Sequence, residues 1–550
     1  MAGGWHVLPG AISSSARNIV DPARVSRLLS ARNSVPASAP PRAGQVLPGL
    51  IVGFVVLCAI ERLVAATIEG FTVDEAYTTV IARSLQLSYF DHPPLHQWIL
   101  HGAVALFGEG RLTRLPFLIA IEAINLPLYW LTRRLYDSAA GLWALFAFNA
   151  AVYFMIWPDG LIVPDAPLLL FLALAVWLLA EILFGPRAGG LRSIALWLGV
   201  GLAFGLAGLS KYSAAFSGLG VIAFLVGSPG HRFWLGRVEP YLGGALALAV
   251  FSPALIWNGE HHWVSFAFQS GRAGQHFSLD VPAAIAIASG LAMQFAAISP
   301  WVAIPLVAAL VTAARQGDAG SADRLLLWLV APTVIFFALL PLVGERAIPH
   351  WFNSGWLFAF PLLGRWLSGR PSLELRRWAV ASAALTVIAT ALFVAFVVIG
   401  PPWQTAFKTG PQHLREPTEL SYDWRGLAAA SAWRASGASP PAFILVDDWK
   451  IGGKAGLAIG PGVPVCDDAP DAREFAFECD WQSRLGEDAL IVVPEGGASR
   501  LLAATAPYFE RIDAIEKTAL GPPGYAEQPV TLARGYNLLR PFVLPYGIGR

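Results

Sequence analysis

Carboxylates and a histidine gather in one short stretch of the sequence, directly after its first long apolar segment. Residues 71–98 read FTVDEAYTTVIARSLQLSYFDHPPLHQW, with Asp74 and Glu75 adjacent and Asp91 and His92 further along. A carboxylate can act as a general base, or it can hold a cation. Ionisable groups beside a membrane-spanning segment are costly, so they commonly mark a functional site. We therefore interpret the stretch as a catalytic loop, although its acids also suit a solvated acidic loop or a helix N-cap.

The same stretch offers two candidate metal ligands, Glu75 and His92. His92 and His96 lie four residues apart, a spacing that can bind a metal when both side chains share one face of a helix. The segment lacks the HExxH pattern of zinc enzymes, and histidines at a membrane interface also form ordinary hydrogen bonds. A divalent cation is the one cofactor that these residues suggest.

Further polar residues lie at the ends of later apolar segments and suit an anionic ligand. We take these residues as candidate substrate-binding residues, together with the Asp91 and His92 pair: Asp165, Lys211, Tyr212, Arg272, Arg346 and His350. Lysine binds phosphate as a point charge, although a lysine at a membrane boundary can also place its amine in water and bind nothing. Asp165 lies between prolines and equally suits a helix N-cap. Several cations near acidic loops indicate an anionic lipid headgroup as the ligand.

The composition is that of a polytopic membrane protein. Of the 550 residues, 55% are hydrophobic and 14% are charged, and the mean hydropathy is +0.55. A soluble globular chain has about 45–50% apolar and about 25% charged residues. The formal net charge of +1 does not indicate nucleic acid as a partner, and we expect membrane lipids instead.

Apolar segments of about 20 residues predict about 11 membrane-spanning helices. The first is 47–68, and the five arginines before it place the N-terminus in the cytoplasm and residues 71–98 outside. Later loops rich in acids, histidine and tryptophan fall on that same outer side. The segment 95–107 is too short and polar to span, so we expect an interfacial helix. In 281–314 we expect one span in the second half, preceded by a partly inserted or interfacial segment.

Composition also divides the chain into three parts. Residues 1–46 are rich in Ala, Ser, Pro and Arg, lack a signal-peptide pattern, and are expected to form a disordered cytoplasmic tail. Residues 47–400 hold the spans. Residues 401–550 are polar with Pro and Gly turns, which predicts a small α/β or α+β domain outside the cytoplasm.

Short β-type runs support this C-terminal domain, at 443–446, 489–493 and 529–532. Two of the three cysteines, Cys466 and Cys479, lie in it. They are candidates for a disulfide if the domain lies in an oxidising compartment.

The order of the motifs resembles that of bacterial membrane glycosyltransferases. These are the proteins of glycosyltransferase family 39 that are related to protein O-mannosyltransferases and to lipid A aminoarabinose and galacturonic acid transferases. The resemblance covers about residues 47–400 and rests on DEAY, YFDHPPL, PDAPL, LSKYSA, WNGEHHWVSFAFQ and PHW. It implies the GT-C fold.

The resemblance also implies a reaction and a role for each matched residue. A hexose or pentose would move, with inversion, from a polyprenyl-phosphate carrier to lipopolysaccharide, another glycolipid or a protein, at the outer face of the bacterial cytoplasmic membrane. Asp74 would be the catalytic carboxylate with Glu75 beside it, and Lys211 would hold the carrier phosphate. The pocket residues would be Asp91, His92 and Asp165, whereas Arg272, Arg346 and His350 match by region alone.

Two other classes of protein fit parts of the sequence. A membrane transporter or lipid flippase would place its ionisable groups near the bilayer midplane, whereas here they cluster in outer loops. A non-catalytic subunit for envelope assembly would use the C-terminal domain as its working part.

Overall fold

The computed structural model describes residues 48–68, 70–152, 154, 161–186, 189–271, 277–399, 424, 427, 440–494, 498–520, 528–543 and 545–547. All of them belong to one structural unit, Val46–Arg550. The predicted N-terminal tail and the predicted domain boundary at residues 400 and 401 lie outside the described residues.

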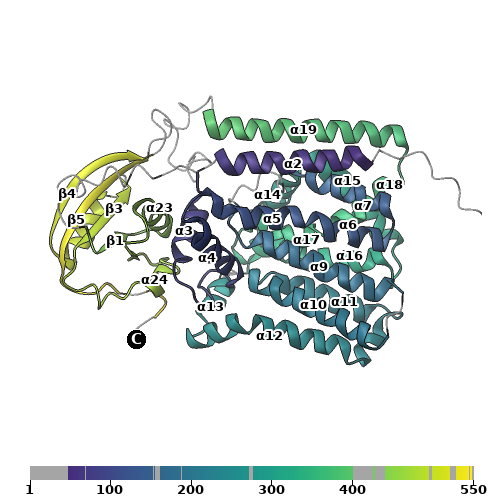
Figure 1. Cartoon of the computed structure of the whole chain (residues 1–550), viewed down its shortest axis with the longest axis horizontal. Helices are drawn as coiled ribbons and strands as arrows, with labels where there is room; N and C mark the ends of the chain where they lie inside the picture. Colours follow the sequence, from purple (N-terminus) through teal and green to yellow (C-terminus); the bar gives the residue numbers. More distant parts are fainter. Residues whose placement is uncertain are drawn as a thin grey trace, which may run out of the picture. The chain divides into compact units, whose positions relative to one another are not determined.

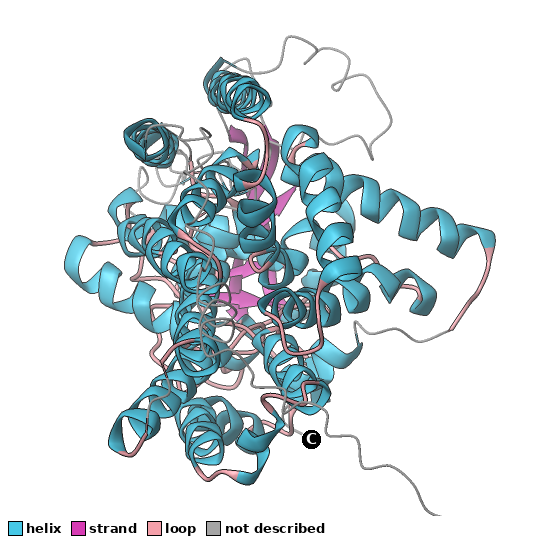
Figure 2. Ribbon diagram, turned by 90° about the vertical axis from the view of Figure 1, so that its right-hand side faces the viewer, coloured by secondary structure: helices cyan, strands magenta, loops and turns pink. Residues whose placement is uncertain are grey.

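Most of the described chain up to residue 399 is helical, and the helices run side by side in both views (Figures 1 and 2). Eight described segments are long and apolar enough to cross a membrane: α2 Pro48–Ile68, Arg111–Leu135 (η1 Arg111–Arg114, α5 Leu115–Ala123, α6 Asn125–Leu135), α9 Asp165–Phe184, α10 Leu191–Ser210, α12 Glu239–Glu260, α14 Val281–Ile298, Ala322–Val343 (α16 Ala322–Leu339, η3 Leu340–Val343) and α19 Ser372–Ile399. Three apolar helices are shorter: α7 Ser138–Ala150, α11 Ala214–Gly227 and α15 Pro300–Gln316. The expected number was about 11, whereas eight of the described segments have the length of a span and the three shorter helices are apolar without reaching it.

The chain forms two helices in 281–314, but the helix with the length of a span is the first of the two and not, as was expected, the second. Ser299 separates α14 from α15 with a positive φ of 81°, and Pro300 follows it. Proline cannot donate to the preceding turn, so it starts a new helix better than it continues an old one. The first of these helices, α14, is the one with the length of a span.

Small residues and one buried polar network hold the bundle together. A Cβ on Gly201 of α10 would lie 2.0 Å from the Gly243 oxygen of α12, so these two helices touch through their backbones, as membrane helices often do. Arg62 of α2 is 2% exposed and lies 2.5 Å from Glu122 of α5. It also donates to Asn149 of α7 at 2.8 Å, which satisfies a charge that would otherwise be costly inside the bundle.

The C-terminal region is built on a five-stranded sheet in the order β2-β1-β3-β5-β4 (Figure 1). Strands β2, β1 and β3 are parallel, whereas β5 is antiparallel to both β3 and β4. Its elements are β1 Phe443–Val446, α23 Trp449–Ile459, β2 Val465–Asp467, α24 Phe475–Glu478, β3 Ala489–Pro494, α25 Ala498–Thr505, η7 Ala506–Tyr508, β4 Phe509–Leu520, β5 Gln528–Leu538 and η8 Pro545–Gly547. The predicted α/β class is confirmed, and the three predicted β-type runs lie in β1, β3 and β5.

The stretch 71–98 packs against this sheet region. It contains α3 Val73–Ile81 and leads into α4 Leu95–Phe107, the helix that was expected at 95–107. Val73 and Tyr77 of α3 share a hydrophobic core with Ile444 of β1 and Trp449 of α23. The remaining short helices are η2 Arg232–Gly236, α13 Val264–Gly271, η4 Pro349–Phe352, α17 Asn353–Trp356 and α18 Ala359–Ser368.

Candidate active site

A capping box starts α3 and thereby positions Asp74. The Thr72 hydroxyl accepts a hydrogen bond from the Glu75 backbone N–H at 3.2 Å, and the Glu75 carboxylate accepts one from the Thr72 N–H at 2.9 Å. This reciprocal arrangement satisfies two N–H groups that the first helical turn leaves without partners. Thr72 is therefore the N-cap, and Asp74 lies in the first turn with its side chain at a cavity.

The cavity brings together residues from six separate parts of the chain. Its volume is about 140 Å³. One buried water needs roughly 10–15 Å³ of such space, so the cavity suits a single sugar ring. Six of the predicted site residues line it, namely Asp74, Asp91, His92, Asp165, Lys211 and His350. The lining also includes Tyr77, His96 and Arg473.

An ion pair joins the first residue of α9 to the C-cap residue that follows α10. The Lys211 amine lies 2.8 Å from Asp165 Oδ2, and both side chains are largely buried. Asp165 makes no side-chain capping bond, so the alternative role as an N-cap does not describe it. Its charge still lies where a helix dipole favours an anion. An ammonium has three donors, so Lys211 can contact a phosphate while it keeps this carboxylate.

Asp91 lies between the helix α3 and the sheet region. Its Oδ2 accepts a hydrogen bond from the Tyr77 hydroxyl, and its Oδ1 lies 3.5 Å from Arg473 Nη1. Burial, together with the Asp91 charge, raises the pKa of Tyr77 well above its ordinary value. Tyr77 is therefore a hydrogen-bond donor to Asp91 at neutral pH.

Glu75 does not line the cavity, although it is adjacent to Asp74 in the sequence. Its side chain is 0% exposed, and Arg114 donates to both its oxygens at 2.9 and 2.6 Å. The Leu161 backbone N–H also donates to it, at 3.0 Å. Burial alone would raise the Glu75 pKa, but the Arg114 charge and these hydrogen bonds outweigh it and lower the pKa. We therefore replace the predicted catalytic role of Glu75 with a positioning role.

The predicted metal ligands do not form a ligand set in the described part of the chain. No group of three His, Cys, Asp or Glu side chains suited to a metal occurs among the described residues. His92 and His96 lie with their ring centroids 5.7 Å apart, and Glu75 is held by Arg114. Burial lowers the pKa of His96 to about 3, so its ring is neutral.

The remaining predicted residues fall in three places. Tyr212 lies in an adjacent groove, with its hydroxyl 2.8 Å from Ser265 Oγ. Arg346 is exposed and is not among the residues that line the cavity. Arg272 lies outside the described residues.

The adjacent groove is apolar and has a volume of about 390 Å³. It shares three lining residues with the cavity, His92, Lys211 and Trp351. Aromatic and aliphatic side chains form most of its wall: Phe216, Phe266, Phe336, Phe337 and Leu340. The site thus combines a small polar cavity with a longer apolar groove, and Lys211 lies where they meet.

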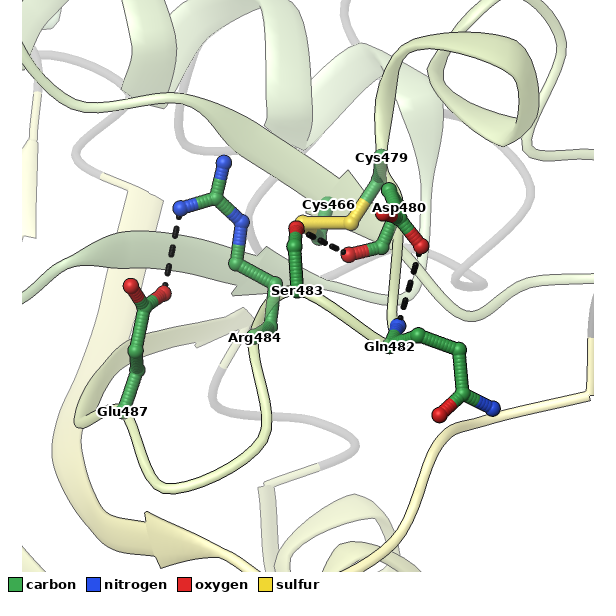
Figure 3. The surroundings of a disulfide bond; sticks show 7 residues. All are labelled: Cys466, Cys479, Asp480, Gln482, Ser483, Arg484 and Glu487. Atoms are coloured by element: carbon green, nitrogen blue, oxygen red, sulfur yellow. Dashed lines mark hydrogen bonds and ion pairs between the residues drawn. A yellow bond between two sulfur atoms is a disulfide. The ribbon is translucent and has the colours of Figure 1, made fainter.

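Sequence reasoning missed Arg473, which reaches the cavity from the sheet region. It lies in the segment between Cys466 of β2 and Cys479, which ends α24. The structure joins these two cysteines in the predicted disulfide, with a Cα–Cα distance of 5.3 Å (Figure 3). The bond ties the segment that carries Arg473 to the sheet. The position of Arg473 between the cysteines was the only signal in the sequence.

Comparisons with known proteins show what this chain resembles. A family model described as dolichyl-phosphate-mannose-protein mannosyltransferase matches residues 91–257. Lipid A galacturonosyltransferase RgtD of Rhizobium johnstonii is 27% identical over 345 residues, which cover 60% of this chain and 66% of RgtD, just under two thirds of that relative.

Solved structures show the same fold. ArnT from Cupriavidus metallidurans matches in its apo state with a TM-score of 0.62, and in its complex with undecaprenyl phosphate with a TM-score of 0.61. Both matches have 15% sequence identity and cover 88% of this chain and 98% of ArnT. RgtD is named as a glycosyltransferase and the matching family model as a mannosyltransferase, and both names agree with the predicted enzyme class. The chain is a multi-pass membrane protein with the fold of ArnT, which is the fold that the order of its motifs predicted.

Proposed function

We propose that the protein is an inverting glycosyltransferase that moves a sugar from a polyprenyl-phosphate carrier to a glycolipid of the cell envelope. The observation that carries this proposal is the position of Lys211, which lines both the polar cavity and the apolar groove. A donor of this class joins a sugar to a long isoprenoid chain through a phosphate. It needs a polar cavity beside an apolar groove, with a cation at the junction.

In this arrangement the isoprenoid chain lies in the groove, the phosphate contacts Lys211, and the sugar enters the cavity. The acceptor oxygen attacks the anomeric carbon from the face opposite the phosphate, and the bond between that carbon and the phosphate oxygen breaks. The electron pair leaves with the phosphate, whose growing charge the Lys211 amine stabilises. With a hydroxyl acceptor, Asp74 accepts the proton, whereas an acceptor that is itself a phosphate needs no base.

The acceptor class and the membrane side rest on the relatives and on the charge pattern. The relative RgtD is named for lipid A, and ArnT was solved with undecaprenyl phosphate, so we take lipid A as the first acceptor to test. The arginine distribution supports a cytoplasmic N-terminus and a site on the outer face of the cytoplasmic membrane. The disulfide Cys466–Cys479 supports an oxidising environment for the sheet region.

The test compares wild-type protein and Asp74→Asn in lipid nanodiscs with polyprenyl-phosphate sugars and lipid A. Loss of a general base typically costs about 10²–10⁴-fold in rate, so with a hydroxyl acceptor we expect Asp74→Asn to lose about 10³-fold in transfer while its melting temperature stays unchanged. The matched control is Asp318→Asn, which changes an exposed acid and should transfer at the wild-type rate.

Two other outcomes of this experiment would contradict the proposal. Full activity of Asp74→Asn on a hydroxyl acceptor contradicts its role as the base. A wild-type protein that transfers no sugar, but moves the labelled carrier across a proteoliposome membrane, contradicts the glycosyltransferase and favours a flippase.

A further inference from the structure

The sheet region contributes one cation, Arg473, to the wall of the cavity. Its guanidinium carbon lies 3.5 Å from the ring centroid of Trp449 in α23, and its side chain is 15% exposed. Such close stacking on an indole holds the flat guanidinium in one orientation. Arg473 is therefore a fixed part of the wall, and not a mobile surface arginine.

The backbone of Arg473 is strained in a way that its surroundings maintain. Its φ is +51°, a left-handed conformation that few residues other than glycine adopt. The Arg473 backbone N–H donates to the Tyr546 hydroxyl at 3.1 Å, and the next residue, Glu474, accepts from the Phe90 backbone N–H at 2.6 Å. Strain of this kind persists where the structure imposes it, commonly at ligand-binding sites.

A second buried arginine shows what an arginine with a purely structural role looks like in this protein. Arg114 is 1% exposed and donates to both Glu75 oxygens and to the backbone oxygens of Ala66 and Gly70, all between 2.6 and 2.9 Å. These bonds use four of the five N–H groups of its guanidinium, so Arg114 is committed to contacts within the protein.

Arg473 differs in the length of its contacts. Its Nη1 lies 3.5 Å from Asp91 Oδ1 and its Nε lies 3.7 Å from Asp471 Oδ2. Both distances exceed the 2.7–3.2 Å that is typical of N–H···O hydrogen bonds. Its buried Nε has no hydrogen-bond partner within the described part of the chain. The acids balance the charge of Arg473, but they leave N–H donors for a substrate.

We propose that Arg473 is a substrate-binding residue that recognises a second oxyanion, distinct from the carrier phosphate. The phosphate belongs at Lys211, because only that cation lines both the cavity and the groove among the described residues. Arg473 lines the cavity but not the groove, so it contacts either the transferred sugar or the acceptor. A guanidinium binds carboxylate and phosphate through two parallel hydrogen bonds. The oxyanion is a carboxylate on the sugar or a phosphate on the acceptor.

This inference rests on the proposed function, and its test separates the two sources of the oxyanion. Wild-type protein, Arg473→Met and Arg473→Lys are compared in nanodiscs with two donors and two acceptors. The donors are polyprenyl-phosphate galacturonic acid and polyprenyl-phosphate galactose, which differ only at C6. The acceptors are lipid A with and without its phosphates. The control is Arg511→Met, an exposed arginine of β4 that also lies over an aromatic ring, Tyr536.

We expect Arg473→Met to lower kcat/KM about 10- to 100-fold for the substrate that carries the recognised oxyanion, and much less for its neutral counterpart. Arg473→Lys should recover part of the loss, because lysine keeps the positive charge but cannot form the two parallel hydrogen bonds of a guanidinium. A loss that follows the donor carboxylate identifies the sugar, and a loss that follows the acceptor phosphate identifies the acceptor. Equal loss on all four combinations, or no loss, overturns the proposal.

Equilibrium binding keeps this test independent of turnover. Dissociation constants of the same lipids are measured for wild-type protein and Arg473→Met. Equal affinity of the wild-type protein for charged and neutral forms contradicts the role of Arg473, even in a preparation that transfers nothing. Selective binding without transfer supports Arg473 while it contradicts the proposed reaction.

Discussion

Two buried glutamates attach residues 71–98 to two regions of the molecule, and the two carboxyl groups differ in charge. Glu75 belongs to this stretch itself, whereas Glu474 belongs to the sheet region. In the helical region, Glu75 is paired with Arg114, and its pKa lies below the ordinary value. In the sheet region, Glu474 accepts hydrogen bonds from the Phe90 N–H and from Gln86. Burial, and then the charge of Glu478, raises the Glu474 pKa well above the ordinary value.

The comparison shows that the partner, and not the depth of burial, decides whether a buried acid is charged. Both residues are 0% exposed. Glu75 has a guanidinium beside it, whereas no ion pair to Glu474 occurs among the described residues. Asp74 is adjacent to Glu75 in the sequence, and Asp91 is adjacent to Phe90, so the cavity depends on both attachments. The first attachment is an ion pair, and the second is a hydrogen-bonded carboxyl group that keeps its proton.

Glu75→Gln should have the largest effect on stability. It leaves the Arg114 guanidinium buried without its counter-charge, which typically costs about 3–5 kcal/mol. We expect a large fall in melting temperature in nanodiscs, with loss of transfer because α3 no longer positions Asp74. Glu374→Gln, at an exposed glutamate of α19, is the control and should leave both unchanged.

A second variant tests whether the loss of stability comes from the unpaired Arg114 charge or from the changed Glu75 side chain. Glu75→Gln combined with Arg114→Gln removes both charges, so the double variant should be more stable than Glu75→Gln alone. A double variant that is less stable by the full sum of the single changes contradicts the ion-pair account.

The sequence predicted the residues of the cavity better than their roles. Asp165 and Lys211 lie at helix ends, Asp91 lies in the loop before the prolines that precede α4, and the structure brings all three to one cavity. Glu75 was predicted to share the role of Asp74 because the two are adjacent, but Glu75 does not line the cavity and is paired with Arg114. Successive residues of a helix point about 100° apart, so Asp74 faces the cavity while Glu75 faces Arg114.

The parts that sequence did not predict depend on contacts between distant segments. The strand β1, Phe443–Val446, is a continuous apolar run and was predicted with its observed bounds. The strand β4 reads FERIDAIEKTAL, with charged residues on an exposed edge, and gave no β-type pattern. Arg473 reaches the cavity only because α23 packs on α3, where a Cβ on Gly453 would lie 2.5 Å from the Tyr77 nitrogen. No local pattern encodes that approach.

Removal of the Cys466–Cys479 disulfide should weaken the attachment of 71–98 to the sheet region. We expect the loss of stability to be smaller than that of Glu75→Gln and larger than that of Glu474→Gln. The bond closes a loop with a sequence separation of 13, and such bonds typically contribute about 2–4 kcal/mol. Cys466→Ala combined with Cys479→Ala should therefore lower the melting temperature and weaken the hold of Glu474 on the Phe90 backbone. A reductant should lower the melting temperature of the wild-type protein but not that of the double variant. Equal sensitivity of both proteins to the reductant contradicts this account.

Glu474→Gln should have the smallest effect, although it is chemically the same change as Glu75→Gln. The folded state already keeps a proton on Glu474, so a neutral amide replaces a neutral carboxyl group. We expect a change of no more than about 1 kcal/mol at pH 6, measured as a shift in melting temperature. A loss at pH 6 as large as that of Glu75→Gln would show that Glu474 is charged and would remove the contrast between the two attachments.

The pH dependence gives this last prediction a sign. The Glu474 pKa is raised in the folded state, whereas the pKa of a glutamate in the unfolded chain is about 4.3. At a pH between these two pKa values, Glu474 binds a proton in the folded state but not in the unfolded state. Stability therefore falls as pH rises above about 4 and stops falling above the folded pKa. Burial acts in the same direction on Glu478, whose pKa is raised to about 7, and on Asp467, whose pKa is raised to about 8. Glu474→Gln should reduce this loss of stability between pH 5 and pH 9, because the amide that replaces the carboxyl group has no proton to lose. An unchanged dependence of stability on pH would show that another group loses the proton.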